Sequence, residues 1–418
     1  MRRLHKLAVA VAVVGLTTAA CGGGGNSQKT ATVAPVANGS STSPSAGTGG
    51  GSSQSSASSS PSSSASTSAA PALVVIKPAG NSSEVDPASQ IQVSVANGKL
   101  TSVTAQLSGG SAVDGTLDPS GASWTSANPV GIDHTYKVTA IAMGDNGKAQ
   151  TVTSQFSTAS PDNTYAGTYT PDPGTTYGIA QPVSITFDKS IPDRAAVEKQ
   201  LTVTSDPPVA GSWHWFGSER VDWRPQQYWA PGTKVTLHMR LDGVKSGSLY
   251  GKQNRDVTFT IGRSLIATMD ANTKKMTVVT GGKTTTLLTS SGKPGFETWN
   301  GTMVVLEKDQ DISMNSDTVG IFGVNAYDIP NVYWDVRLTP SGTFVHAAPW
   351  NAGKFGNVNG SHGCIGMSTD DAEWFFNQVI PGDPVTVVNS KDTVRADNGF
   401  GDWNLSWSDW IAGSALPH

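Results

Sequence analysis

Two neighbouring stretches decide how the C-terminal half of the chain folds: GTFVHAAPW at 342–350 and SHGCIGMS at 361–368. The first stretch has the composition of a strand that brings His346 to its end, and a loop rich in Gly and Asn follows at 351–360. Ser368 is a residue type that often caps the N-terminus of a helix. Two aspartates follow it, and their negative charges favour the first helical turn. With a further strand at 385–388, these elements predict a β-rich domain with one or two short helices.

Cys364 is the only cysteine after position 21, so it has no partner for a disulfide within the folded part of the chain. His362 lies two residues before it, and in a strand both side chains would point to one face. His346 lies 16 residues before His362, which a neighbouring strand could bring close. A histidine beside a cysteine can take the thiol proton and create a nucleophile. The alternatives are an inert buried thiol and a zinc site made by the same three residues.

The chain upstream of this region also alternates as strands do, in two sets. Turn sequences at 96–98, 118–121 and 144–147 separate the strands of the first set. A linker at 159–162 precedes the second set, which includes a short helical pattern at 193–201. The expected architecture is therefore mainly β, with two immunoglobulin-like sandwiches before the catalytic domain. The expected segments are 1–20, 21–72, 73–158, 159–263, 264–390 and 391–418.

Aromatic residues gather in two places outside the expected catalytic domain. Trp213, Trp215 and Trp223 fall within 11 residues, and we interpret them as core and interdomain packing rather than as a sugar-binding platform. In the last segment, the tryptophans fall at i, i+4 and i+7, one face of a helix. We expect Trp403, Trp407 and Trp410 to pack that segment on the catalytic domain. The spacing of the three remaining histidines of the β domains suggests no metal site: His134, His214 and His238.

The N-terminus has the pattern of an exported protein. A basic start and about ten apolar residues precede small residues and Cys21, which predicts a signal peptide at 1–20. A cysteine directly after two alanines resembles a bacterial lipobox, so we expect Cys21 to be lipidated and to hold the protein on a membrane. Residues 41–70 contain 15 serines, which predicts a flexible tether over 21–72.

Overall composition excludes several classes of protein. A net charge of -4 argues against a nucleic-acid binder, which would need a basic surface. Two cysteines exclude a disulfide framework and a cysteine-rich zinc module. After the N-terminal segment, no stretch approaches the roughly 18 apolar residues of a membrane-spanning helix.

The motif around His346, together with Ser361-His362-Gly363-Cys364, resembles the signature of the L,D-transpeptidases with a YkuD-type catalytic domain. Residues 211–225 resemble the membrane-proximal immunoglobulin-like domain of actinobacterial members, and residues 401–410 resemble their C-terminal extension. The resemblance implies a lipid-anchored enzyme with two immunoglobulin-like domains before the catalytic domain.

The resemblance also implies roles for the motif residues. Cys364 would attack the donor stem peptide, and His346 would act as general base. Ala347 would orient that base through its main-chain carbonyl, and His362 would assist substrate positioning and proton transfer. The backbone N–H groups of Gly363 and Cys364 would stabilise the oxyanion.

Further residues are implied in substrate binding, partly from a mobile lid over 315–339. Gly366 stands where the family usually has Asn or Arg, so a side chain that lines the pocket is missing. Members of the family place a tyrosine of the lid over the site, and spacing alone does not decide whether Tyr327 or Tyr333 is that residue. The implied substrate-binding residues are Ser361, Ala347, Tyr327, Tyr333, Met314, Gly366, Trp350 and Asn359.

The function implied is the formation of 3→3 cross-links between peptidoglycan stem peptides, with release of D-Ala from a donor tetrapeptide. Two alternatives remain: an enzyme of the same fold acting as an L,D-carboxypeptidase or joining proteins to peptidoglycan, and a non-catalytic wall-binding lipoprotein. We expect no cofactor, no metal and no nucleic acid partner. A monomer anchored by Cys21 on the outer face of the cytoplasmic membrane, facing the cell wall, is expected.

Overall fold

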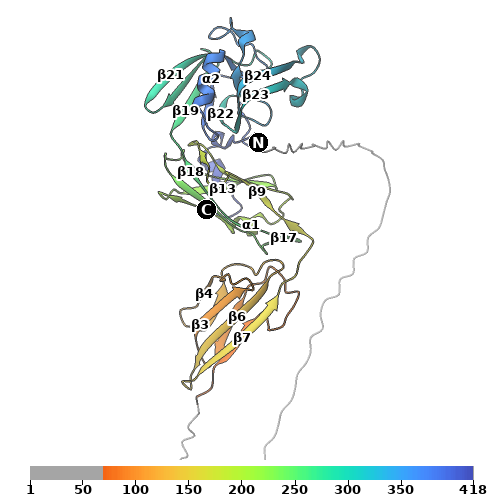
Figure 1. Ribbon diagram of the computed structural model, residues 1–418, viewed down its shortest axis with the longest axis vertical. Helices are drawn as coiled ribbons and strands as arrows, with labels where there is room; N and C mark the ends of the chain where they lie inside the picture. Colours follow the sequence, from red (N-terminus) through yellow and green to blue (C-terminus); the bar gives the residue numbers. More distant parts are fainter. Residues whose placement is uncertain (1–68, 418) are drawn as a thin grey trace, which may run out of the picture. The chain divides into compact units, whose positions relative to one another are not determined.

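The computed structural model describes residues 69–417, in which three β-rich regions follow one another along the chain (Figure 1). The expected signal peptide, Cys21 and most of the expected tether lie outside these residues. Within the described part, no helix is long and apolar enough to cross a membrane.

The first region is a sandwich of two sheets, with strand orders β1-β2-β5-β4 and β3-β6-β7. Asn97, Gly121 and Gly147 have positive φ at the three predicted turns, so the turn chemistry was interpreted correctly. A strand that the pattern did not predict, β1, opens the domain. The strands are β1 Leu73–Lys77, β2 Gln92–Ala96, β3 Gly98–Leu107, β4 Gly115–Leu117, β5 Ser123–Ser126, β6 Thr135–Gly144 and β7 Ala149–Ser157.

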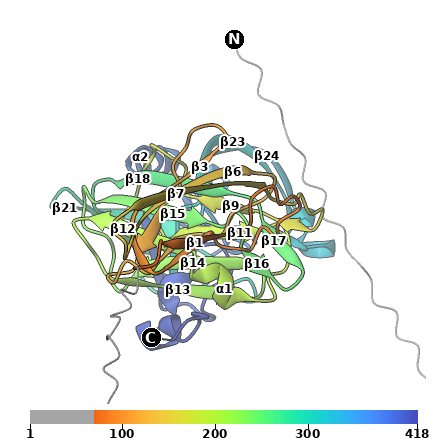
Figure 2. The same cartoon turned by 90° about the horizontal axis from the view of Figure 1, so that it is seen from below.

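The second region is also a sandwich, formed by sheets β10-β18-β15-β12 and β13-β14-β11-β9, with a small sheet β16-β17-β8. The predicted short helix is present as α1 (Arg194–Glu198), whose N-cap Asp193 accepts a hydrogen bond from Ala196 N at 3.0 Å. Figure 2 shows α1 beside β16. The strands are β8 Thr164–Tyr165, β9 Gly167–Thr170, β10 Thr176–Tyr177, β11 Val183–Phe187, β12 Leu201–Asp206, β13 Gly211–Phe216, β14 Arg220–Pro225, β15 Lys234–Arg240, β16 Lys245–Ser246, β17 Leu249–Gly251 and β18 Asn254–Ile261.

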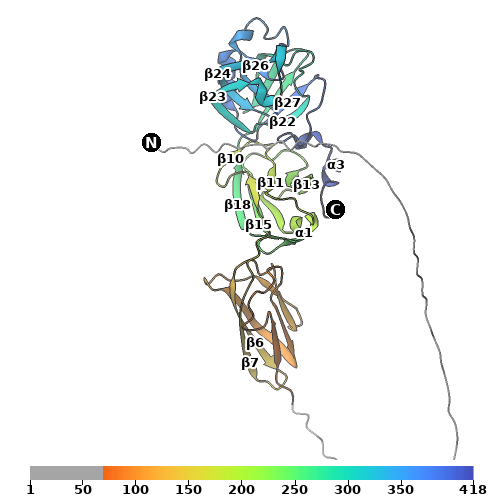
Figure 3. The same cartoon turned by 90° about the vertical axis from the view of Figure 1, so that its right-hand side faces the viewer.

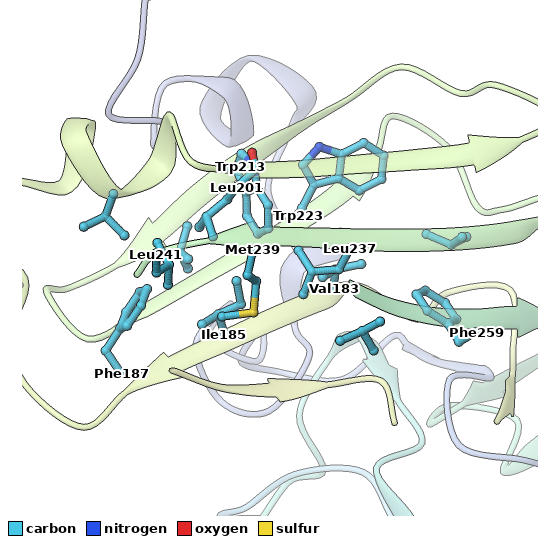
Figure 4. Packing of buried hydrophobic residues seen from close by; sticks show 14 of the residues in the cluster. Val183, Ile185, Phe187, Leu201, Trp213, Trp223, Leu237, Met239, Leu241 and Phe259 are labelled. Carbon is cyan, nitrogen blue, oxygen red and sulfur yellow. The ribbon is translucent and has the colours of Figure 1, made fainter. Parts of the chain in front are cut away.

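The tryptophans of the second region belong to its core. Trp213 and Trp223 come from the paired strands β13 and β14 and lie among the aliphatic side chains of the other strands (Figure 4). Trp215 is buried in the same cluster and stacks on Phe187. These rings are 5–7% exposed, which leaves them no surface for stacking on a sugar. The packing interpretation is therefore confirmed.

The third region is built on a nine-stranded sheet of order β22-β27-β19-β20-β21-β26-β25-β24-β23. All neighbours are antiparallel except the pairs β19–β27 and β25–β26. A two-residue turn at Gly281 and Gly282 joins β20 to β21, and both glycines have positive φ. The strands are β19 Leu265–Asp270, β20 Lys275–Thr280, β21 Lys283–Ser290, β22 Gly301–Val304, β23 Glu307–Asn315, β24 Asp328–Arg337, β25 Phe344–Ala347, β26 Ile365–Met367 and β27 Pro384–Val388.

Helix α2 (Thr369–Gln378) packs on β25 and β26, which border the motif, and on the neighbouring strand β24. Ser368 Oγ accepts a hydrogen bond from Asp371 N at 3.1 Å, so the predicted cap is confirmed. Phe375 and Ala372 are fully buried in the core of this region. The helix therefore holds β25 and β26 in place directly behind the motif. Three short 3-10 helices complete the region: η1 Ser316–Val319, η2 Gly323–Asn325 and η3 Pro349–Asn351.

The C-terminal segment forms two short helices rather than one: η4 (Asp402–Asn404) and α3 (Trp407–Ile411), with Ser406 as the N-cap of α3. The three tryptophans therefore do not lie along one helix face. Their rings surround the Arg224 guanidinium, with centroids at 4.7, 5.5 and 4.4 Å from its central carbon.

That arginine belongs to β14, so the tryptophans pack mainly on the second β region and not, as we expected, on the catalytic domain. Trp410 is fully buried and donates its indole N–H to Ser212 O at 2.9 Å. Figure 3 shows α3 beside β13. The same segment also contacts the catalytic region, because the Asn404 side chain hydrogen-bonds both backbone groups of Thr302 at 2.7 Å. It thus joins the two regions.

Two of the histidines outside the catalytic region hydrogen-bond aspartates, and the third bonds a backbone carbonyl. His134 contacts Asp242 at 2.7 Å and His238 contacts Asp256 at 2.6 Å. His214 contacts Trp410 O at 2.9 Å. Among residues 69–417, no group of three or more His, Cys, Asp or Glu side chains is placed to hold a metal ion.

Candidate active site

A cavity of about 260 Å³ opens beside β25 and the turn that enters β26. It brings together Cys364, His346 and His362, the three residues singled out from the sequence. The full lining is Met314, Tyr327, Ile329, His346, Ala348, Trp350, Asn351, Lys354, Gly360, Ser361, His362, Cys364 and Gly366.

Cys364 is 9% exposed and carries a free thiol, whose S–H donates to Gly342 O at 3.4 Å. Burial raises the pKa of Cys364 to about 11. The charge of the buried Asp335 also raises it, but burial lifts the pKa of Asp335 itself to about 8. At neutral pH Cys364 is therefore a neutral thiol rather than a thiolate.

His346 lies on β25 and is 5% exposed. Its Nδ1 bonds the carbonyl of Ala347 at 2.7 Å, which makes Nδ1 the protonated nitrogen and leaves Nε2 free to accept a proton. Burial lowers the pKa of His346 to about 4, so the ring is neutral at physiological pH. Trp350 stacks on the ring with centroids 5.9 Å apart and fixes its plane. Ala347 thus contacts the base through its carbonyl, and its side chain does not line the cavity.

His362 faces the cavity from the other side of Cys364. Lys293 Nζ donates to His362 Nε2 at 2.9 Å, so the hydrogen of a neutral ring sits on Nδ1. Burial and the positive charge of Lys293 both lower the pKa of His362. The rings of Phe296 and Tyr327 contact it at centroid distances of 4.9 and 5.2 Å. His362 is therefore held as a neutral hydrogen-bonding group.

The segment 361–364 is a bend and not a strand, so our reason for placing His362 and Cys364 on one face was wrong. Gly363 has a φ of 124°, a conformation that favours glycine, and β26 begins only at Ile365. Ser361 Oγ closes the bend by donating to Cys364 O at 2.6 Å and accepting from Gly363 N at 3.1 Å. Because the Gly363 N–H already has this partner, it is not free to bind an oxyanion in this state of the site.

The lid contributes Met314, Tyr327 and Ile329 to the cavity. Of the two candidate tyrosines, Tyr327 lines the cavity, whereas Tyr333 is 47% exposed and lies outside the lining. Burial raises the pKa of Tyr327, and the nearby Cys364 raises it further. The structure therefore resolves the choice that spacing left open.

Two other expected binding residues have different outcomes. Gly366 lines the cavity and pairs with His346 across β25 and β26. A Cβ atom at position 366 would lie 2.9 Å from Ala348 Cβ, so a larger residue would require Ala348 to shift. Asn359 does not reach the cavity. Its side chain accepts from Ser291 N at 3.2 Å and donates to Ala271 O at 2.9 Å, so its role is to hold the loop.

A second cavity of about 330 Å³ adjoins the first and shares His362 and Tyr327 with it. It carries two acidic residues, Glu297 and Asp392, whereas no carboxylate lines the first cavity. The two cavities that meet at His362 and Tyr327 therefore differ in charge, and Cys364 lines only the first of them.

Six residues of the site escaped the sequence analysis: Lys293, Ile329, Ala348, Asn351, Lys354 and Gly360. Lys293 is 69 positions from His362 in the chain, so spacing gave no signal for their contact. Asn351 and Lys354 belong to the predicted loop 351–360, in which a single lysine among Gly and Asn was the available clue.

Comparisons with known proteins identify the family of this chain. A family model described as the L,D-transpeptidase catalytic domain (YkuD) matches residues 265–387, and a bacterial Ig domain model (Big_10) matches residues 82–245, across both sandwiches. L,D-transpeptidase 2 of Mycobacterium tuberculosis is 39% identical over 333 residues, which cover 78% of this chain and 80% of the relative.

L,D-transpeptidase 5 of the same species is 37% identical over 354 residues, covering 82% of this chain and 77% of the relative. A crystal structure of L,D-transpeptidase 3 from Mycobacterium tuberculosis is 30% identical and covers 54% of this chain and 98% of its own, with a TM-score of 0.45. The expected fold, with immunoglobulin-like domains before a YkuD domain, is confirmed. The chain belongs to the L,D-transpeptidase family, whose members act on the stem peptides of peptidoglycan.

Proposed function

We propose that this enzyme forms 3→3 cross-links through a thioester on Cys364. The observation that carries the proposal is the single cavity that joins a buried thiol, a neutral imidazole on the adjoining strand and a second histidine. A neutral base with a free Nε2 suits the removal of a proton from a thiol that rests uncharged.

In the first half-reaction, the Cys364 sulfur attacks the carbonyl carbon of the third residue of the donor stem, a diamino acid. The thiol proton passes to His346 and then to the nitrogen of the departing D-Ala. The peptide bond breaks and a thioester forms. Backbone amides near the turn at 361–364 are proposed to stabilise the oxyanion, with Cys364 N–H as our candidate, since Gly363 N–H is already bonded.

In the second half-reaction, the side-chain amine of an acceptor diamino acid attacks the thioester. Its proton passes to His346 and returns to the sulfur, so the enzyme is regenerated and an amide joins the two stems. The second cavity supports this step, because its carboxylates Glu297 and Asp392 suit an approaching amine. His362, held neutral by Lys293, would position the reactants.

We propose further that the protein works as a monomer in the cell envelope, anchored by a lipidated Cys21 on the outer face of the cytoplasmic membrane. The short basic and apolar N-terminus that ends in Ala-Ala-Cys supports the anchor. Metabolic labelling with a fatty-acid probe tests it, and labelling that survives Cys21→Ala would contradict it.

Incubation of the purified protein with a tetrapeptide stem tests the reaction itself. We expect release of D-Ala, a covalent adduct on the protein by intact mass, and a cross-linked dimer, all lost in Cys364→Ala. A tripeptide without dimer would show hydrolysis and favour the carboxypeptidase. No D-Ala release and no adduct would leave the non-catalytic wall-binding protein.

A further inference from the structure

We propose that Lys354 determines substrate specificity by binding a carboxylate of the donor stem peptide. The proposal rests on the donor reaction described above and goes beyond it, because it names the chemical group that the cavity selects. No residue of the catalytic motif supplies this selectivity.

The backbone of Lys354 is held rigidly next to the catalytic strand. Lys354 N donates to Asn351 O at 2.8 Å, and Asn351 N donates to Ala348 O at 2.8 Å, directly after β25. Lys354 O accepts from the N–H groups of Asn357 and Val358, both at 2.9 Å. This turn fixes the start of the lysine side chain at the wall of the cavity.

The side chain then lies across Gly360, the residue that precedes the catalytic motif. A Cβ atom at position 360 would lie 2.8 Å from Lys354 Cδ and 2.9 Å from Nζ. Gly360 does not have the positive φ that would itself require glycine. The absence of a side chain at Gly360 lets the ammonium group lie beside the motif, and a Cβ atom there would displace the end of the lysine.

The ammonium group is also electrostatically available. No Asp or Glu lines the cavity, and the two histidines of the lining have lowered pKa values. Within residues 69–417, no ion pair is formed by Lys354. A cation in a cavity without anions attracts an anionic ligand. The donor stem supplies one, because its terminal D-Ala ends in a carboxylate, and an inner residue of the stem can supply another.

Steady-state kinetics of D-Ala release with three donor stems tests the proposal. One stem keeps every carboxyl free, one has the terminal carboxyl as an amide, and one has the inner carboxyls as amides. With the free-acid stem, we expect Lys354→Met to raise KM about tenfold with kcat within about twofold, since a charge-assisted hydrogen bond is lost from the ground state and transition state alike. Lys354→Arg should keep the wild-type KM within about threefold because it keeps the charge.

Lys283→Met is the matched control, because Lys283 is exposed at the β20–β21 turn and lies outside the cavity. The amide stem for which wild type and Lys354→Met have equal KM identifies the carboxylate that is bound. Gly360→Ala should raise the KM of wild type and add little to Lys354→Met, because both changes act through one side chain.

An unchanged KM of Lys354→Met with the free-acid stem, while wild type releases D-Ala, would overturn the role of Lys354 and leave the proposed reaction intact. Equal effects of Lys354→Met on all three stems would also overturn it. If wild type releases no D-Ala from any stem, the proposed reaction itself fails.

Discussion

Two of the places where the described residues bury ionisable groups treat those groups differently. In the active site, Cys364 and His346 are buried without an opposite charge, so burial moves both pKa values toward the uncharged form. At the junction with the C-terminal segment, the half-buried Arg220 contacts the fully buried Asp222 and Asp402. Burial alone would lower the pKa of Arg220, but the two aspartates raise it overall.

The difference teaches that close opposite charges can outweigh burial, as they do for Arg220, whereas for the fully buried Asp402 burial still raises the pKa. Arg220 forms a two-pronged contact with Asp222 and also donates to Gly399 O at 2.8 Å. These bonds stabilise the contact between β14 and the C-terminal segment. The active site lacks such partners, so its two groups stay neutral and can exchange a proton when the substrate arrives.

The largest expected effect comes from removing the base. His346→Ala should lower the rate of D-Ala release about 10³-fold, the usual contribution of a general base. The melting temperature is measured in parallel, because the ring is 5% exposed and its removal also leaves a cavity. His238→Ala is the control, since that residue lies on β15 outside the cavity and should keep full activity. A His346→Ala enzyme within tenfold of wild type would contradict the assigned role.

Removing Arg220 from the contact with the C-terminal segment should lower stability and leave activity nearly unchanged. Arg220→Met leaves Asp222 and Asp402 buried without their main cation, and we expect the free energy of unfolding to fall by about 3 kcal/mol. D-Ala release per folded molecule should stay close to wild type. Denaturant unfolding measures the first quantity.

Arg395→Met is the matched control, because its ion pair with Asp397 is at the surface and the arginine side chain is 81% exposed. That change should cost no more than about 0.5 kcal/mol. Equal losses of stability in the two variants would remove the distinction between the buried pair and the surface pair.

The pH profile sharpens the comparison. The pKa of His346 is lowered to about 4 and only the neutral ring is a base, so acylation should be full above that pH and fall as pH drops through 4. The loss should reach about tenfold per pH unit below the pKa. Intact mass during the reaction with the tetrapeptide measures it, with near-UV circular dichroism to check folding. An inflection near 6.5 would show that the ring is not desolvated.

The smallest expected effect separates the two lid tyrosines. Tyr327→Ala removes a ring that lines the cavity and contacts His362, and should raise KM for the donor stem about fivefold. Tyr333→Ala removes a ring that is half exposed and outside the lining, so KM should stay within about twofold. Equal effects of the two changes would contradict the assignment of the lid tyrosine.

Local chemistry made much of the fold predictable. Asn97, Gly147 and the pair Gly281–Gly282 adopt the positive φ that their hairpins need, and the caps at Asp193 and Ser368 are set within a few residues of sequence. The three motif residues also meet in one cavity, although His362 and Cys364 lie on a bend and not on the strand from which we argued.

The features that we could not predict from the sequence depend mostly on contacts between residues far apart in the chain. The i, i+4, i+7 pattern of tryptophans suggested a helix, but their common neighbour is Arg224, about 180 residues earlier in the chain, and it draws the segment onto the second β region. Tyr327 differs from Tyr333 only in the direction that the lid gives each side chain. The 361–364 bend arises from a Ser361 side-chain bond that competes with the strand ladder.

The parallel pairing of β25 with β26 has a consequence for how such an enzyme can diversify. His346 and the start of β26 lie side by side in one register, although the chain leaves the sheet after Ala347 and returns only at Ile365. The loop 351–360, which forms part of this excursion, carries Lys354 but none of the catalytic residues, and it lies outside the paired strands. The sequence of this loop can therefore change without moving the catalytic residues. Such changes would alter the substrate preference and keep the reaction.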